Sequence, residues 1–194
     1  LSGPGAFVTP TSGGSSADVE LAGTITNPGT ITFADDGSSG TQERLEIDGA
    51  TTLTGGGEVV MTSSSSRLQT RVGGLADDEL TNEDNTIRGQ GTISVPLVNK
   101  GTIRAEGGTL SVTGAPPGAF DAPAKFENTE GRVEIASDGT LQATGFISST
   151  TPLSFGNLFI EEGGLIAQGS QFNNLTLSGP GAFVTPTSGG SSAD

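Results

Sequence analysis

Apolar residues recur at every second position in short runs, and turn-forming residues separate these runs. The clearest runs are Leu45-Glu46-Ile47, Leu110-Ser111-Val112, Val133-Glu134-Ile135, Leu158-Phe159-Ile160 and Leu175-Thr176-Leu177. A period of two predicts short β-strands with one buried face. No window holds three turns of helical periodicity, so the pattern predicts an all-β protein.

Two short motifs mark where these strands begin. The first is a Gly-Thr-Ile/Leu triplet, which begins at Gly23, Gly29, Gly91, Gly101, Gly108 and Gly139. Gly permits a bend, and Thr and Ile favour the strand that follows it. The second motif places Asn two residues after an apolar residue and just before a bend, at Asn27, Asn82, Asn99 and Asn128. Asn suits such corners, and stacked corners would align these residues into a ladder.

Very short strands with tight corners predict a parallel β-solenoid with roughly 20 to 30 residues in each coil. Longer loops are expected over Thr62–Glu79, Gly114–Ala124 and Ser148–Pro152. The alternative is a string of Ig-like β-sandwiches of roughly 90 residues each. It is disfavoured because no core Trp is present and alternating runs of full strand length are scarce.

The sequence of residues 1–18, LSGPGAFVTPTSGGSSAD, recurs without change at residues 177–194. An identity at a fixed offset is typical of tandem repeat proteins. Position 1 is Leu and no leader-like segment follows it, so we expect the chain to be a segment of a longer tandem array. Residues 1–176 would be one full repeat of about six to eight coils, and residues 177–194 the start of the next.

The amino-acid composition reduces the number of function classes that fit the chain. Hydrophobic residues make up only 31% of the chain, which suits a thin elongated core better than a globular one. The net charge of −14 disfavours binding to nucleic acid or to anionic membranes. No apolar stretch is long enough to insert into a membrane. The absence of Cys and His excludes the usual nucleophile systems and zinc sites.

We predict no catalytic, cofactor-binding or metal-binding residue. The only candidate ligands for calcium are the acidic clusters Asp35-Asp36, Asp77-Asp78-Glu79, Glu83-Asp84 and Glu161-Glu162. None of these clusters matches an EF-hand or a calcium-binding β-roll repeat. We interpret them as solvated loops that keep the sheet edges soluble, with a calcium site as the alternative.

Two segments, LVNKGTIRAEGGTLSV (Leu97–Val112) and FENTEGRVEIASDGTLQ (Phe126–Gln142), resemble β-solenoid repeats of large bacterial surface proteins. These proteins include autotransporter passenger domains and filamentous adhesins. The resemblance implies a right-handed parallel β-helix, secretion, and a role as fibre, stalk or adhesin. It supplies no catalytic residue.

We therefore expect a structural building block of an extracellular or cell-surface filament, and not an enzyme. Its partner would be another copy, end to end, and filaments could also bundle laterally. At the junction, Leu1, Phe7 and Val8 would pack under Val19 and Leu21 of the following coil or against the end of the preceding repeat. One alternative is an adhesin that binds glycans or a host surface through its long loops. Another is a polysaccharide lyase or glycosidase built on a β-helix.

Overall fold

The computed structural model describes residues 17–33, 42–71, 77–113, 126–143, 154–161, 164–167, 171–178 and 183–186. These residues form strands, corners and turns, and no helix occurs among them. The strands are β1 (Ala17–Thr26), β2 (Thr30–Phe33), β3 (Glu43–Thr54), β4 (Glu58–Met61), β5 (Arg67–Thr70), β6 (Glu79–Asn82), β7 (Thr86–Ser94), β8 (Leu97–Asn99), β9 (Thr102–Val112), β10 (Phe126–Ile135), β11 (Thr140–Ala143), β12 (Ser154–Glu161), β13 (Gly164–Ala167), β14 (Gln171–Ser178) and β15 (Phe183–Pro186).

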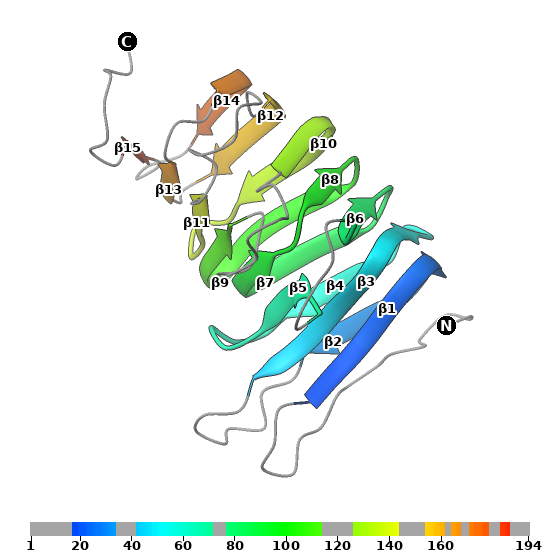
Figure 1. Cartoon of the computed structure of the whole chain (residues 1–194). Helices are drawn as coiled ribbons and strands as arrows, with labels where there is room; N and C mark the ends of the chain where they lie inside the picture. Colours follow the sequence, from blue (N-terminus) through cyan, green and yellow to red (C-terminus); the bar gives the residue numbers. More distant parts are fainter. Residues whose placement is uncertain are drawn as a thin grey trace.

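The strands pair in parallel and stack into three ladders that run along one axis (Figure 1). Ladder A contains residues 17–22, 43–48, 67–70, 91–94, 109–112, 140–143, 164–167 and 183–186. Ladder B contains residues 24–26, 50–54, 79–82, 97–99, 126–128, 154–155 and 171–172. Ladder C contains residues 30–33, 58–61, 86–89, 102–105, 132–135, 157–161 and 174–178.

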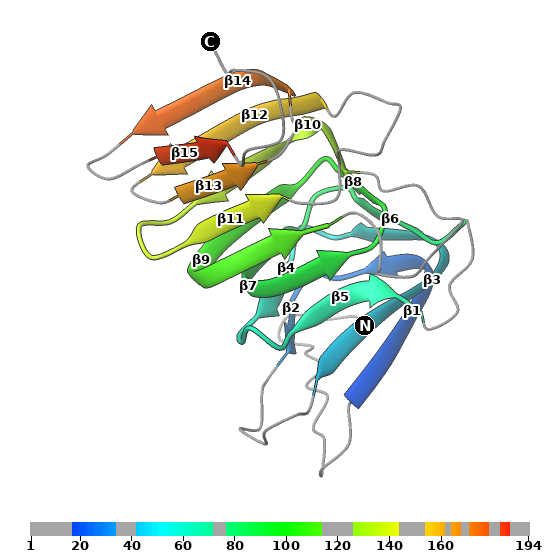
Figure 2. The same ribbon diagram turned by 60° about the vertical axis from the view of Figure 1, so that its left-hand side comes forward.

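The chain visits ladders A, B and C in turn and so completes seven coils between residues 17 and 178. Successive register partners on ladder A are 19 to 31 residues apart, as from Ile93 to Val112 and from Val112 to Ala143. The structure thus confirms the predicted parallel β-solenoid, and the alternative of β-sandwiches is wrong. Figure 2 shows the ladder A strands in front, running to the right as the chain rises toward its C terminus, which makes the coil right-handed.

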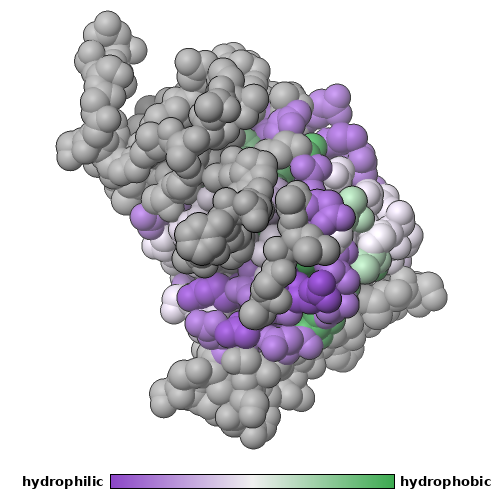
Figure 3. All heavy atoms as spheres, viewed as in Figure 1, coloured by the Kyte–Doolittle hydropathy of each residue, from purple (hydrophilic) through white to green (hydrophobic). Residues whose placement is uncertain are grey.

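Apolar residues form columns inside the coil because like positions stack from one coil to the next. On ladder C, the register partners Ile31, Val59, Ile87, Ile103 and Val133 are all at most 2% exposed. Polar side chains cover most of the described surface on the face that Figure 3 shows. Narrow columns of this kind are enough to make a core, which explains the low apolar content of the sequence.

The glycine of each Gly-Thr-Ile/Leu triplet lies at or directly after a corner, and the two residues that follow begin the next strand, as predicted. Gly23 lies between ladders A and B, Gly29 and Gly101 lie between B and C, Gly108 and Gly139 lie between C and A, and Gly91 is the first paired residue of its strand on ladder A. Three of these positions can hold only glycine. A Cβ atom at Gly139 would collide with the carbonyl oxygen of Ala105, one at Gly101 with that of Asn85, and one at Gly91 with that of Ser66. The neighbouring coil therefore fixes the residue type at these corners.

One predicted loop contains a strand. The expected loop over Thr62–Glu79 is wrong in its middle, because Arg67–Thr70 forms β5 and pairs with β3 and β7 on ladder A. Its only large apolar side chain, that of Leu68, is 1% exposed. Pairing on both edges compensates for this weak apolar pattern. The loops expected over Gly114–Ala124 and Ser148–Pro152 lie outside the described residues.

The second copy of the repeated sequence takes part in the ladders. Strand β14 crosses the boundary between residues 176 and 177, where Leu177 is the register partner of Ile160. Strand β15 lies wholly within the second copy and pairs with β13. The first copy lies outside the described residues up to position 16, and so do Leu1, Phe7 and Val8, whose packing at the junction stays a prediction.

The stacked core predicts a contrast between neighbouring positions on β9. Ile103→Ala removes a fully buried side chain from a column, and we expect it to lower the free energy of unfolding by about 2–5 kcal/mol. Thr102→Ala, on the outward side of the same strand, is the control and should change it by less than about 1 kcal/mol. Urea unfolding followed by circular dichroism measures both, and similar losses would contradict the inward column.

Candidate functional site

The buried asparagines at the corner between ladders B and C form hydrogen-bonded ladders. Asn27, Asn82, Asn99 and Asn128 have no exposed surface. The Nδ2 atom of Asn82 donates to Oδ1 of Asn99 at 2.8 Å, and Nδ2 of Asn99 donates to Oδ1 of Asn128 at 2.5 Å. The predicted ladder is therefore present. It links three consecutive coils through side chains as well as through backbone strands.

Each of these side chains also closes its own corner. Asn82 Nδ2 donates to the carbonyl of Asn85 at 2.9 Å, and Asn128 Nδ2 donates to that of Gly131 at 3.1 Å. A side-chain amide carries both donors and an acceptor, so it can hydrogen-bond to the neighbouring coil and to its own turn at the same time. The asparagine ladder thus satisfies polar groups that would otherwise be buried without partners.

A second asparagine pair joins coils that are not neighbours. Asn27 Nδ2 donates to Oδ1 of Asn85 at 3.0 Å, past the second coil, whose corner is Gly55-Gly56-Gly57. A Cβ atom at Gly57 would collide with the carbonyl oxygens of Asn27 and Gly29. The sequence motif did not include Asn85, although it lies only three residues after Asn82 and is also fully buried.

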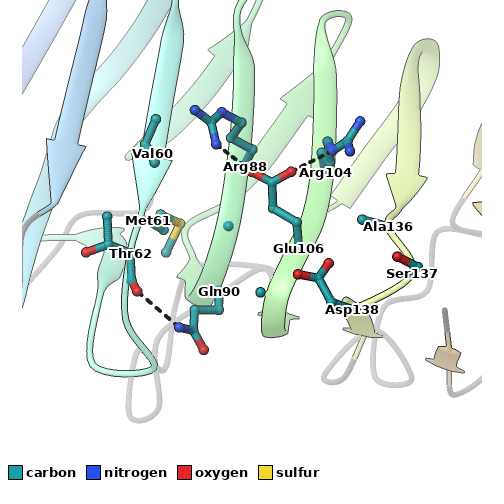
Figure 4. Close-up of a pocket in the computed structure, with 12 residues that line it drawn as sticks. Val60, Met61, Thr62, Arg88, Gln90, Arg104, Glu106, Ala136, Ser137 and Asp138 are labelled. Carbon is teal, nitrogen blue, oxygen red and sulfur yellow. Dashed lines mark hydrogen bonds and ion pairs between the residues drawn. The ribbon is translucent and has the colours of Figure 1, made fainter.

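The outward side of ladder C carries a row of ion pairs (Figure 4). Arg88 and Arg104 are register partners, so two like charges stack about one strand spacing apart. Glu106 lies between them, 2.5 Å from Arg88 Nη1 and 2.7 Å from Arg104 Nε. Hydrogen bonds to carboxylates raise the pKa of both guanidinium groups, from Glu58 and Glu106 at Arg88 and chiefly from Glu106 at Arg104.

The row continues to both sides of this pair. Arg88 Nη2 lies 3.1 Å from Glu58, and Arg104 Nη1 lies 3.1 Å from Glu134. Glu134 is also 2.6 Å from Arg132 Nε. Alternating charge therefore links four consecutive coils on the outside of the solenoid.

A polar groove of about 560 Å³ lies beside this row, at the corner that leads from ladder C to ladder A. It is lined by Val60, Met61, Thr62, Arg88, Gly89, Gln90, Arg104, Glu106, Gly107, Ala136, Ser137 and Asp138. Gln90 Nε2 donates to the carbonyl of Thr62 at 3.0 Å and bridges two of the corner loops. The lining offers hydrogen-bonding groups and no aromatic platform, and its Glu106 is held between two arginines.

Residues of the described acidic clusters form hydrogen bonds and an ion pair with neighbouring coils. Asp78 is 1% exposed and accepts a hydrogen bond from the backbone of Gly49 at 2.7 Å, so its interpretation as a solvated loop residue is wrong. Asp84 accepts one from the backbone of Gly56 at 3.0 Å, and Glu83 pairs with Lys100 at 2.8 Å.

Of the other acidic clusters, Asp35-Asp36 lies outside the described residues, and the side chains of Glu161-Glu162 are not described. Within the described part of the chain, no three carboxylates are grouped to hold a metal ion.

Both axial ends of the described solenoid present open strand edges. At the N-terminal end, β1 pairs only with β3 and β2 only with β4, as far as the described strands go. Val19, Leu21 and Ile25 of β1 are partly buried, whereas their register partners on β3 are at most 3% exposed. At the other end, β14 and β15 are the last described strands of their ladders. These two ends are the surfaces at which stacking can continue.

Comparisons with known proteins identify no family: no family model matches the chain, and no curated protein or solved structure is significantly similar to it. Across the residues that the structure describes, there is no helix that could span a membrane.

The asparagine ladder predicts a large effect from a small substitution. Asn99→Ala removes the partner of Asn128 Oδ1 and of Asn82 Nδ2, and should lower the free energy of unfolding by about 2 kcal/mol. Lys100→Ala removes an exposed side chain from the next position and is the matched control, which should leave the unfolding midpoint nearly unchanged. Chemical unfolding of both variants tests this, and equal midpoints would contradict a stabilising ladder.

Proposed function

We propose that this chain is a structural building block of an extracellular or cell-surface filament made of tandem β-solenoid repeats. The observation that carries the proposal is the path of the chain through the repeated sequence. The ladder C part of β14, residues 174–178, runs from the first repeat into the second copy without a break in its pairing, and β15 continues ladder A within that copy. Sequence identity and strand pairing therefore agree on where one repeat would continue into the next.

The partner proposed for each axial end is another copy of the repeat. Open parallel edges pair readily with further strands, and the half-buried Val19, Leu21 and Ile25 would gain cover from an added coil. A neighbouring repeat at each end would supply the backbone groups and the apolar column that would continue the described strands. With strands about 4.8 Å apart, seven coils add roughly 34 Å to the length of a filament.

The composition supports a mechanical role. A net charge of −14 favours solubility and keeps separate filaments apart, so lateral bundling would require cations or a basic partner to offset the repulsion. The carboxylate best placed in the groove, Glu106, is bound to two arginines and completes a structural row of charges. No observation favours the lyase or glycosidase alternative.

A comparison of one and two repeats tests the proposal. A chain of residues 1–176 followed by 1–194 should unfold in one transition, several degrees above the single chain, because each interface adds stability. The control inserts a flexible Gly/Ser linker between Thr176 and the following Leu1, which should abolish the gain. Calorimetry measures both chains. Equal unfolding temperatures with and without the linker would overturn the proposal.

A second candidate function is adhesion to a glycan or a host surface. The polar groove favours it, because its volume lies in the range of small-molecule sites and its lining offers both donors and acceptors. The side chain of Asp138 lines the groove from a corner turn on the outside of the coil.

A binding assay separates adhesion from a purely structural role. If the groove binds a sugar, Asp138→Asn should weaken retention on a glycan array at least tenfold while leaving the unfolding temperature unchanged. Ser111→Ala, on the outward side of ladder A, is the control and should have no effect on retention. Equal retention of the two variants, or no retention of the parent chain, would contradict adhesion through this groove.

A further inference from the structure

The two copies of the repeated sequence set a condition on how repeats can join. Pro186 lies on ladder A, in the register column that includes Val112, Ala143 and Ala167. Val19 belongs to the same column, through Leu45, Leu68 and Ile93. Pro186 corresponds to Pro10 of the first copy, so the Val19 of a following repeat would come nine residues after Pro186.

Nine residues are too few to complete a coil. Successive positions in this column are never fewer than 19 residues apart among the described strands, as from Ile93 to Val112. Steps from ladder A to ladder B are shorter, from four residues between Ile93 and Leu97 to 14 between Val112 and Phe126. The Val19 of a following repeat can therefore reach ladder B, whereas ladder A is out of range.

The spacing of the next two strands is also compatible with a shift from each ladder to the next one. From Val19 to Ile25 is six residues, which equals the step from Leu97 on ladder B to Ile103 on ladder C. From Ile25 to Ile31 is again six residues. The step from Ile87 on ladder C to Ile93 on ladder A has the same length. The spacing of these strands thus permits them to move by one ladder without a change in corner length.

We propose that consecutive repeats are joined with a rotation of one ladder, a third of a turn about the axis. This inference rests on the proposed tandem array and deepens it. Each repeat then spans seven coils and one further strand position, so three repeats return a given side chain to its starting face. The groove and the charged row of ladder C would appear on the three sides of the filament in turn.

The rotation specifies which strands meet at the junction. The Ile25 of the following repeat would lie over Leu175, in the column that includes Ile103, and Thr26 would lie beside Thr176. In an unrotated array, Thr30–Phe33 would stay on ladder C and place Thr32 beside Thr176. The two arrangements therefore give Thr176 different neighbours.

Cysteine cross-linking distinguishes these neighbours, since the natural sequence contains no Cys. The probe is a chain of residues 1–176 followed by 1–194, with Thr176→Cys in the first repeat. A second cysteine is placed at Thr26 or at Thr32 of the second repeat, and a short bis-thiol reagent is added. Thr86→Cys with Thr102→Cys, which are register partners on adjacent coils, is the positive control.

We expect cross-linking through Thr26 at a rate near that of the control, and through Thr32 at least tenfold more slowly. Preferential cross-linking through Thr32 would overturn the rotation and leave the proposed filament standing. Cross-linking through neither site, with the control intact, would overturn the continuous array and the rotation with it. Equal rates through both sites would show a disordered junction and would also overturn the rotation.

Discussion

Registered stacking of each residue on its counterpart one coil away is the constraint on which the rest of this structure depends. Parallel strands lie about 4.8 Å apart, so every side chain must tolerate its neighbours in the column. Apolar residues meet this condition inside the coil, where Ile87 and Ile103 stack with no exposed surface. Outside the coil, stacked Arg88 and Arg104 repel each other, and Glu106 between them offsets the repulsion. The same constraint therefore selects the core and the surface.

The corners show why asparagine and glycine recur. An amide carries both donors and an acceptor, so identical side chains can hydrogen-bond along the axis, as Asn82, Asn99 and Asn128 do. A carboxylate column at these buried positions would place like charges together, and leucine would leave backbone groups without partners. Glycine is required where the backbone of the neighbouring coil leaves no room for a Cβ atom, as at Gly101 and Gly139.

Local features of the fold could be predicted from the sequence. The alternation of apolar and polar residues, the glycine triplets and the Asn motif each involve only residues that are close together in the chain. The strand β5 was missed because Leu68 is its only large apolar residue and its stability comes from pairing on both edges. The charged row and the groove could not be predicted, since coils of 19 to 31 residues give no fixed spacing from which to infer which charges meet. Asp78 was misread for the same reason: its partner, Gly49, lies on another coil.

A thin solenoid has little core in any one coil and gains stability by adding coils, which is the physical basis of the proposed continuous array. The most direct measurement is a cryo-electron microscopy map of a chain of three consecutive repeats, at a resolution that separates strands. The account predicts unbroken layers of density about 4.8 Å apart through each junction between Thr176 and the following Leu1. Separate lobes joined by a gap in the ladders at these junctions would contradict it.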